Sequence, residues 1–314
     1  MARDIKINIQ YPINEKEVVK FDYCKPVVDR IVDEIKSKAK NEKKAKYSQN
    51  IKRIIKGCAP TQIELREYAE QIIQYYIDNF SILDLGYDDV SMKLEIITHK
   101  YELDPYGVHL GKIIRKDDIH NVSIYINYMT ILNNMIQNEY NTSKLDKEYY
   151  CVSIWKDKTK NKFLLNLRYE MAREICCWMQ AYEFSKKGIT IISDHGKLLG
   201  KILAEYFAFC YINEFIYSVG IDEEKLDYTF GKDYKKGKIK YGFLEAAHKF
   251  TNDPYGDMRD SAHYGGELLA ALAIKDGCEN FGNKYDFYRK LYEDFLKEEY
   301  RKGIQRLIDR KGEI

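Results

Sequence analysis

The sequence lacks the long apolar runs that mark membrane and secreted proteins. No stretch approaches the roughly 18 apolar residues that a transmembrane helix needs. The N-terminal "MARDIKINIQ" has no apolar h-region of the kind found in secretory signals. We therefore expect no membrane span, no secretion and a cytoplasmic location.

Several diagnostic motifs are missing too. The chain has no P-loop, no dinucleotide-binding glycine fingerprint and no G-x-S-x-G, so nucleotide-dependent chemistry has no support in the sequence. The 7 cysteines form no C-x-x-C pair. The neighbours Cys176 and Cys177 would project about 100° apart on a helix, too far to bridge each other without distortion. Reduced thiols of a cytosolic protein fit this pattern best.

The composition is that of a globular protein with a substantial core. The chain has 314 residues, of which 45% are hydrophobic and 32% charged, and a formal net charge of +2. Positive charge is concentrated in "KSKAKNEKKAK" and the following "IKRIIK". This basic segment is either a solvated helix face or a nucleic-acid contact. The second interpretation would use Lys43, Lys44, Lys46, Lys52 and Arg53.

Periodicity divides the chain into a helical N-terminal region, residues 1–85, and an α+β region, residues 86–314. The first region could form a separate small domain. The predicted strands cover 4–11 and three segments within 91–126, which would form a small antiparallel or mixed sheet, and a short one is possible at 150–155. The predicted helices cover 25–41, 45–56, 61–80, 127–139, 161–186, 196–219, 243–250, 261–277 and 284–309. The fold class that follows is α+β, predominantly helical, with the small sheet packed on two central helices, 161–186 and 196–219.

These two central helices each carry a carboxylate in apolar surroundings. In the first, Glu174 and Cys177 lie roughly 60° and 120° from the centre of the apolar stripe, and Arg173 lies nearly opposite it. The second helix is apolar almost all round and contains Glu205. Because a buried lone carboxylate is costly, Glu205 should have a cation, a metal or a hydrogen-bond network as its partner.

The region 120–280 resembles the gluzincin branch of the zincin-like metallopeptidases. In that family H-E-x-x-H supplies two histidine ligands and a general base, and a glutamate on a following helix supplies the third ligand. Here "REICC" stands where H-E-x-x-H would stand, and "AEYFAFCYINE" is similar to the helix of the third ligand. The resemblance also makes "NVSIYIN" the edge strand of a substrate cleft. "HYGGELLAALAIKDG" is similar to the helix after the site, which makes Tyr264 a binding residue.

The departures from this pattern point to an inactive relative. Arginine cannot bind zinc because its guanidinium stays protonated. Cys177 and Glu205 alone are too few ligands for a catalytic zinc site. We therefore expect a catalytically inactive zincin-like protein, without a cofactor, that binds a protein or peptide. In this hypothesis Arg173 replaces the metal and pairs with Glu205, Glu174 or both. The cleft beside "NVSIYIN" would hold the partner along a strand edge.

Other interpretations of these residues remain open. Without the resemblance, Glu174 and Glu205 belong to two ordinary core helices. An active zinc peptidase would need a non-standard site from Cys177, Glu205 and His263, with Glu174 as the catalytic base. Four weaker candidates remain. A di-iron E-x-x-H site would use Glu245 with His248, and a ribonuclease-like "RDSAH" element would use Arg259 with His263. A metal could bind the His-x-x-x-Glu pair of His263 and Glu267 together with His248, and Cys177 could be a nucleophile with His195 or His263 as its base.

Overall fold

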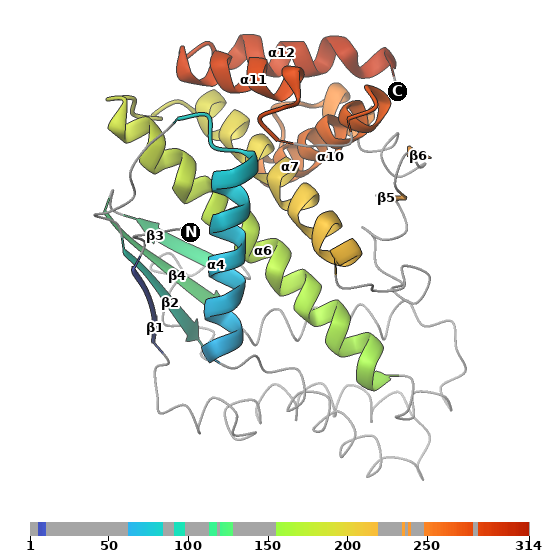
Figure 1. Ribbon diagram of the computed structural model, residues 1–314. Helices are drawn as coiled ribbons and strands as arrows, with labels where there is room; N and C mark the ends of the chain where they lie inside the picture. Colours follow the sequence, from blue (N-terminus) through green and yellow to red (C-terminus); the bar gives the residue numbers. More distant parts are fainter. Residues whose placement is uncertain are drawn as a thin grey trace, which may run out of the picture.

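The computed structural model describes ten segments of the chain, and their architecture is α+β and predominantly helical (Figure 1). The described segments are 6–10, 62–83, 91–97, 113–117, 120–127, 155–218, 234–235, 238–239, 248–278 and 282–313. The predicted helices at 25–41, 45–56 and 127–139 lie outside them, as do all five basic residues of the nucleic-acid hypothesis. None of the described helices has both the length and the hydropathy needed to span a membrane.

Four strands form one mixed sheet in the order β1-β2-β4-β3. β1 (Lys6–Gln10) pairs parallel with β2 (Ser91–Ile97), and β2 pairs parallel with β4 (Asn121–Asn127). β3 (Ile113–Asp117) pairs antiparallel with β4 and forms one edge. The predicted strands and the mixed sheet are confirmed in these segments. A separate pair, β5 (Tyr234–Lys235) and β6 (Lys238–Ile239), is antiparallel.

The expectation that "NVSIYIN" is an edge strand was wrong. This segment is β4, which lies between β2 and β3. Its alternation correctly indicates a buried face, since Val122 and Ile124 are both buried. Interior and edge strands can share this alternation, however, so the pattern does not tell how many neighbours the backbone has.

Helices α4 (Gln62–Asn79) and α6 (Trp155–Lys186) connect the sheet to the core. α4 packs against β1, and α6 packs against β3 and α4. α6 begins earlier than predicted, because Trp155 and the polar "KDKTKNK" are helical. That polar run has no apolar stripe for periodicity to register, although lysine is compatible with a helix. α6 ends as expected at Gly188, whose φ of 72° is easy for glycine and unfavourable for other residues.

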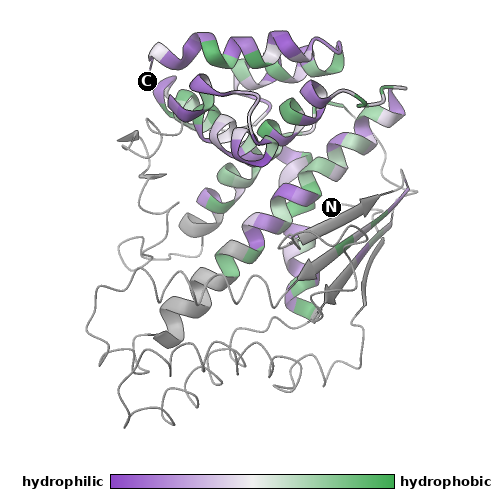
Figure 2. Ribbon diagram, turned by 180° about the vertical axis from the view of Figure 1, so that it is seen from behind, coloured by the Kyte–Doolittle hydropathy of each residue, from purple (hydrophilic) through white to green (hydrophobic). Residues whose placement is uncertain are grey.

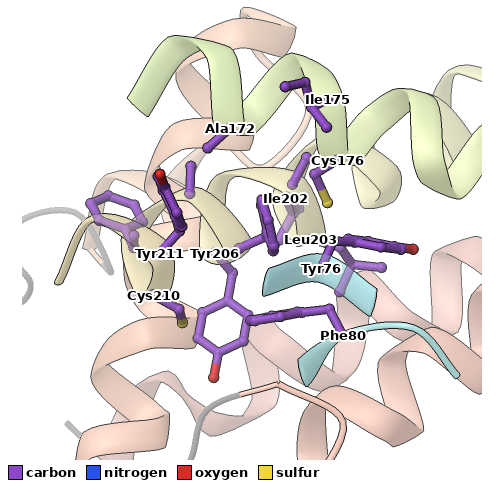
Figure 3. Packing of buried hydrophobic residues seen from close by; sticks show 14 of the residues in the cluster. Tyr76, Phe80, Ala172, Ile175, Cys176, Ile202, Leu203, Tyr206, Cys210 and Tyr211 are labelled. Carbon is purple, nitrogen blue, oxygen red and sulfur yellow. The ribbon is translucent and has the colours of Figure 1, made fainter. Parts of the chain in front are cut away.

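Helix α7 (Asp194–Ser218) is the centre of the molecule. It begins where the Ser193 hydroxyl accepts a 3.1 Å hydrogen bond from the backbone N–H of Gly196. It packs against α6, α10, α11, α12 and α4, and its side chains are buried on nearly every side between Ile202 and Ile212. Figure 3 shows α7 side chains between those of α6 and α4; the labelled ones are Ala172, Ile175, Cys176, Ile202, Leu203, Tyr206, Cys210, Tyr211, Tyr76 and Phe80.

The carboxylate of Glu183, in α6, lies in this core with no exposed surface. It accepts hydrogen bonds from the hydroxyls of Tyr76 at 3.0 Å and Ser81 at 2.6 Å, and also from the hydroxyl of Tyr292. Tyr76 lies in α4 and Tyr292 in α11. The described part of the N-terminal region thus shares one core with the later helices. The domain boundary at residue 85 stays a prediction.

The C-terminal part consists of α10 (Met258–Lys275), α11 (Asp286–Leu296), α12 (Tyr300–Asp309) and the short 3-10 helix η2 (Arg310–Glu313). The prediction of one helix over 284–309 was wrong. The helix breaks at Glu298, whose φ of 58° is left-handed. In a straight helix Phe295 and Tyr300 would point about 140° apart, whereas the break lets both rings pack together at 5.5 Å. In Figure 2 hydrophilic and hydrophobic residues alternate around these helices, as expected for helices with one face on a core.

Candidate functional site

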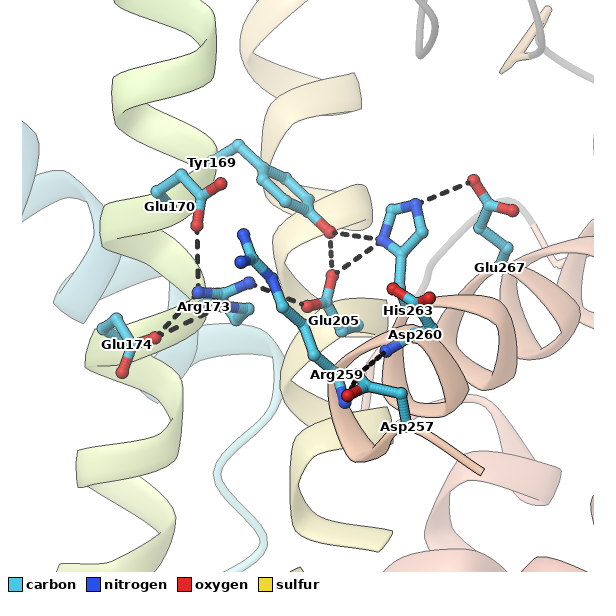
Figure 4. A network of polar contacts seen from close by, with 10 residues as sticks. All are labelled: Tyr169, Glu170, Arg173, Glu174, Glu205, Asp257, Arg259, Asp260, His263 and Glu267. Carbon is cyan, nitrogen blue, oxygen red and sulfur yellow. Dashed lines mark hydrogen bonds and ion pairs between the residues drawn. The ribbon is translucent and has the colours of Figure 1, made fainter. Parts of the chain in front are cut away.

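Glu205 is the central residue of a polar network where α6, α7 and α10 meet (Figure 4). Its side chain is only 3% exposed. α10 approaches α7 closely here because Gly266 has no side chain. A Cβ atom on Gly266 would lie 2.5 Å from Glu205 Cβ and 3.1 Å from the Tyr206 backbone nitrogen. This approach brings the preceding turn of α10, with His263, against Glu205.

Arg173 of α6 connects three carboxylates. Its Nη1 lies 3.2 Å from Oε1 of Glu205, and its Nη2 lies 2.9 Å from both Glu174 Oε1 and Glu170 Oε2. Arg173 is 17% exposed, and the Glu170 side chain is 5% exposed, so water screens these ion pairs only partly. The expected pairing of Arg173 with Glu205 and Glu174 is therefore present.

The other oxygen of Glu205 faces a tyrosine and a histidine. The Tyr169 hydroxyl donates a hydrogen bond to Glu205 Oε2, and His263 Nδ1 lies 3.3 Å from the same oxygen. The second ring nitrogen of His263, Nε2, lies 3.4 Å from Glu267 Oε1. His263 thus bridges a carboxylate of α7 and one of its own helix (Figure 4).

The pKa values of these groups fix their charges at neutral pH. Burial favours the neutral form of Glu205, but the hydrogen bond from His263 and the charge of Arg173 outweigh it and lower the pKa of the carboxyl. Burial alone would lower the pKa of His263, whereas Glu205 and Glu267 raise it to about 10. Burial and the Glu205 charge raise the pKa of Tyr169 well above its usual value. At pH 7 Glu205 is therefore ionised, His263 is protonated and Tyr169 is neutral.

The network has more negative than positive groups. Four carboxylates, those of Glu170, Glu174, Glu205 and Glu267, surround the two cations Arg173 and His263. Each cation already lies within ion-pair distance of at least two carboxylates. The arrangement fixes three helices against one another. The raised pKa values of His263 and Tyr169 keep both side chains protonated at neutral pH.

Of the three residues of the non-standard metal site, the structure brings Glu205 and His263 together but places Cys177 elsewhere. Cys177 lies one helical turn beyond Arg173 and lines a separate pocket between the end of α6 and the start of α7. Across the described segments, no cluster of three or more His, Cys, Asp or Glu side chains is arranged to hold a metal ion. In the resemblance drawn from the sequence, Arg173 stands where the zincin family has its first histidine ligand, and a guanidinium cannot bind zinc.

The other candidates have different surroundings. Tyr264 contacts its neighbour His263 with ring centroids 6.0 Å apart, and the Lys249 ammonium lies 5.2 Å from the Tyr264 ring. His195 accepts a hydrogen bond from Arg301 at 3.3 Å. His248 is exposed and lies 3.2 Å from the Asn252 amide, whereas Glu245, its expected partner in the di-iron site, lies outside the described residues.

The contributions of Tyr169 and Glu170 were not predicted from the sequence, and neither was the ion pair of His263 with Glu205. Two signals were present. Glu170, Arg173 and Glu174 have the i, i+3 and i+4 spacing of ion pairs on one helix face. The glycine pair Gly265–Gly266 follows His263, and adjacent glycines in a helix often mark close approach of another backbone.

Comparison with known proteins gave no relative: no family model, no curated protein and no solved structure matches this chain.

Proposed function

We propose that this protein is a catalytically inactive zincin-like protein that acts by binding another protein or a peptide. One observation carries the proposal: Arg173 Nη1 lies 3.2 Å from Glu205 Oε1. In the resembling family these two positions provide ligands to one metal ion. Here a guanidinium and a carboxylate neutralise each other directly, so the pairing holds the two helices together without a metal.

The chemistry of the remaining groups supports the same proposal. Glu174, in the position of the general base, is ion-paired to Arg173 at 2.9 Å. His263 has a pKa of about 10 and is protonated near neutral pH, so it cannot accept a proton there. Tyr169 is neutral and donates a hydrogen bond to Glu205. None of these three groups is prepared to activate a water molecule.

The proposed partner surface is the strand edge beside α6. β4 has neighbours on both sides, so a peptide cannot pair along it. β3 is an edge of the described sheet and packs against α6, the helix that carries Arg173. An extended segment of a partner could add to β3 through backbone hydrogen bonds, a common way for a sheet edge to bind a peptide.

Restoring the histidines tests the ancestry and the inactivity together. The variant with Arg173→His and Cys177→His carries two imidazoles one helical turn apart on α6, in the spacing of the resembling family. We expect one zinc per chain in this variant by elemental analysis, and no stoichiometric zinc in the natural protein. Cys177→His alone serves as the control, because it leaves the Arg173–Glu205 pair in place. A folded double variant without zinc would overturn the zincin-like scaffold.

The inactive state has its own test. Incubation of the natural protein with zinc and a fluorogenic peptide mixture should give no cleavage above buffer. Metal-dependent cleavage that disappears in Glu174→Gln would show an active peptidase instead. Binding at β3 would be measured by hydrogen exchange with peptides selected from a random library. Protection should appear at the amides of residues 113–117, and protection confined to other segments would contradict the placement of the partner.

A further inference from the structure

A pocket of about 560 Å³ lies where α6 turns into α7. Its volume falls within the roughly 300–1,000 Å³ typical of small-molecule sites. Apolar walls come from Phe184 of α6 and from Ile189 and Ile191 of the connecting loop. No residue of the Arg173–Glu205 network lines it, so this pocket is a second site, independent of the proposed function.

A buried amide in the pocket lacks a partner. Gln180 lines the pocket and is only 2% exposed. Within the part of the chain that the structure describes, its Nε2 has no hydrogen-bond partner. Buried amide donors are nearly always satisfied, because losing the hydrogen bonds to water is costly. An oxygen atom of a bound molecule would supply the missing acceptor.

The charge of the pocket favours an anion. Lys197 and Lys201, one helical turn apart on α7, line it, and no carboxylate is found among its described lining residues. Asp194 provides a counter-charge, with its Oδ1 3.4 Å from Lys197 Nζ. Both side chains of this pair are more than half exposed, at 51% and 80%, so the pair is weak. The first turn of α7 adds the positive end of a helix dipole.

We propose that this pocket binds a small amphipathic organic anion. The apolar body lies against Phe184, Ile189 and Ile191. An oxygen atom on that body accepts a hydrogen bond from Gln180 Nε2, and the carboxylate meets Lys197 and Lys201 at the rim. The thiol of Cys177 lines the same pocket, so a bound ligand covers it.

Three probes separate these contributions on the full chain. 6-Hydroxy-2-naphthoate has the apolar body, the hydroxyl oxygen and the carboxylate; 2-naphthoate lacks the hydroxyl, and 6-hydroxy-2-naphthamide lacks the charge. Affinity is measured by calorimetry, and occupancy by the rate at which iodoacetamide alkylates Cys177, followed by mass spectrometry. Cys278 is the internal control, because it is also partly buried but does not line the pocket.

We expect 6-hydroxy-2-naphthoate to bind at one site and to slow alkylation of Cys177 but not of Cys278. The amide should bind about tenfold more weakly, because it lacks the charge that two lysines attract. No protection of Cys177 by millimolar probe, or equal affinity of the amide and the carboxylate, would overturn the proposal.

Variants assign the parts of the pocket. Gln180→Met keeps the side-chain shape and removes the unpartnered amide. The affinity for 6-hydroxy-2-naphthoate should therefore fall about fivefold, whereas the affinity for 2-naphthoate should stay the same. The melting temperature of the variant should not fall. Lys201→Met should weaken both carboxylates about two- to fivefold, whereas Lys290→Met on α11 should weaken neither. Equal losses for both naphthoates in Gln180→Met, or an equal effect of Lys290→Met, would refute the assignment.

Discussion

Replacing Arg173 by methionine removes the α6 charge that pairs with Glu205 while keeping most of the side-chain volume. The variant leaves Glu205, at 3% exposure, and Glu170, at 5%, without their arginine. Breaking a buried ion pair by removing one partner typically costs about 3–5 kcal/mol. Because protonated His263 still lies 3.3 Å from Glu205, we expect a loss of about 3 kcal/mol in the free energy of unfolding at pH 7.

The assay is urea unfolding followed by circular dichroism, with unchanged slopes required so that midpoints can be compared. Glu205→Gln should cost only about 1–2 kcal/mol, because Arg173 keeps Glu170 and Glu174 as partners. The double variant should lose at least about 1 kcal/mol less than the sum of the single losses. Arg301→Met on the exposed side of α12 should change stability by less than about 0.5 kcal/mol. Additive effects of the two network variants would refute a direct Arg173–Glu205 interaction.

Two further predictions concern α10. The pKa of His263 is raised from 6.5 to about 10 in the folded protein, so its stabilising contribution is complete below pH 6.5 and is lost as the pH rises toward 10. Its side chain is 38% exposed, so water screens the charge, and we expect the free energy of unfolding to fall by only about 1–2 kcal/mol over this range. In His263→Asn, measured in parallel by urea unfolding, the free energy of unfolding should fall less over the same pH range. An identical fall in both proteins would contradict the assignment. Gly266→Ala should cost about 1–3 kcal/mol, because the new methyl group would meet the α7 backbone at Tyr206; thermal unfolding measures this, and an unchanged melting temperature would show that the helices can separate freely.

Much of the helical framework could be predicted from the sequence. The apolar all-round pattern of 196–219 placed α7 at the centre, and Gly188 marked the end of α6. Periodicity wrongly predicted one helix over 284–309, because a single residue in a left-handed conformation, Glu298, redirects the chain. Periodicity continues across such a break, because the apolar residues on both sides still belong to helices.

For the site, the cost of burying a carboxylate predicted that Glu205 needs a partner, and the geometry of arginine identified Arg173. The contributions of Tyr169, His263 and Glu267 could not be derived in the same way. They depend on how closely α10 approaches α7, and that distance is set by packing at Gly266 rather than by any pattern within one helix. Strand order was inaccessible for a related reason, since β4 lies between β3, which directly precedes it in the chain, and β2, and no pattern within a strand tells which strands lie beside it.

The buried Glu183 has a consequence for when the protein can finish folding. Its hydroxyl donors Tyr76 and Tyr292 are 107 positions before it and 109 positions after it in the sequence. As the chain leaves the ribosome, Glu183 and Tyr76 emerge well before Tyr292. The carboxylate therefore stays without one of its donors until α11 has been made, and this part of the core closes only after that helix has emerged.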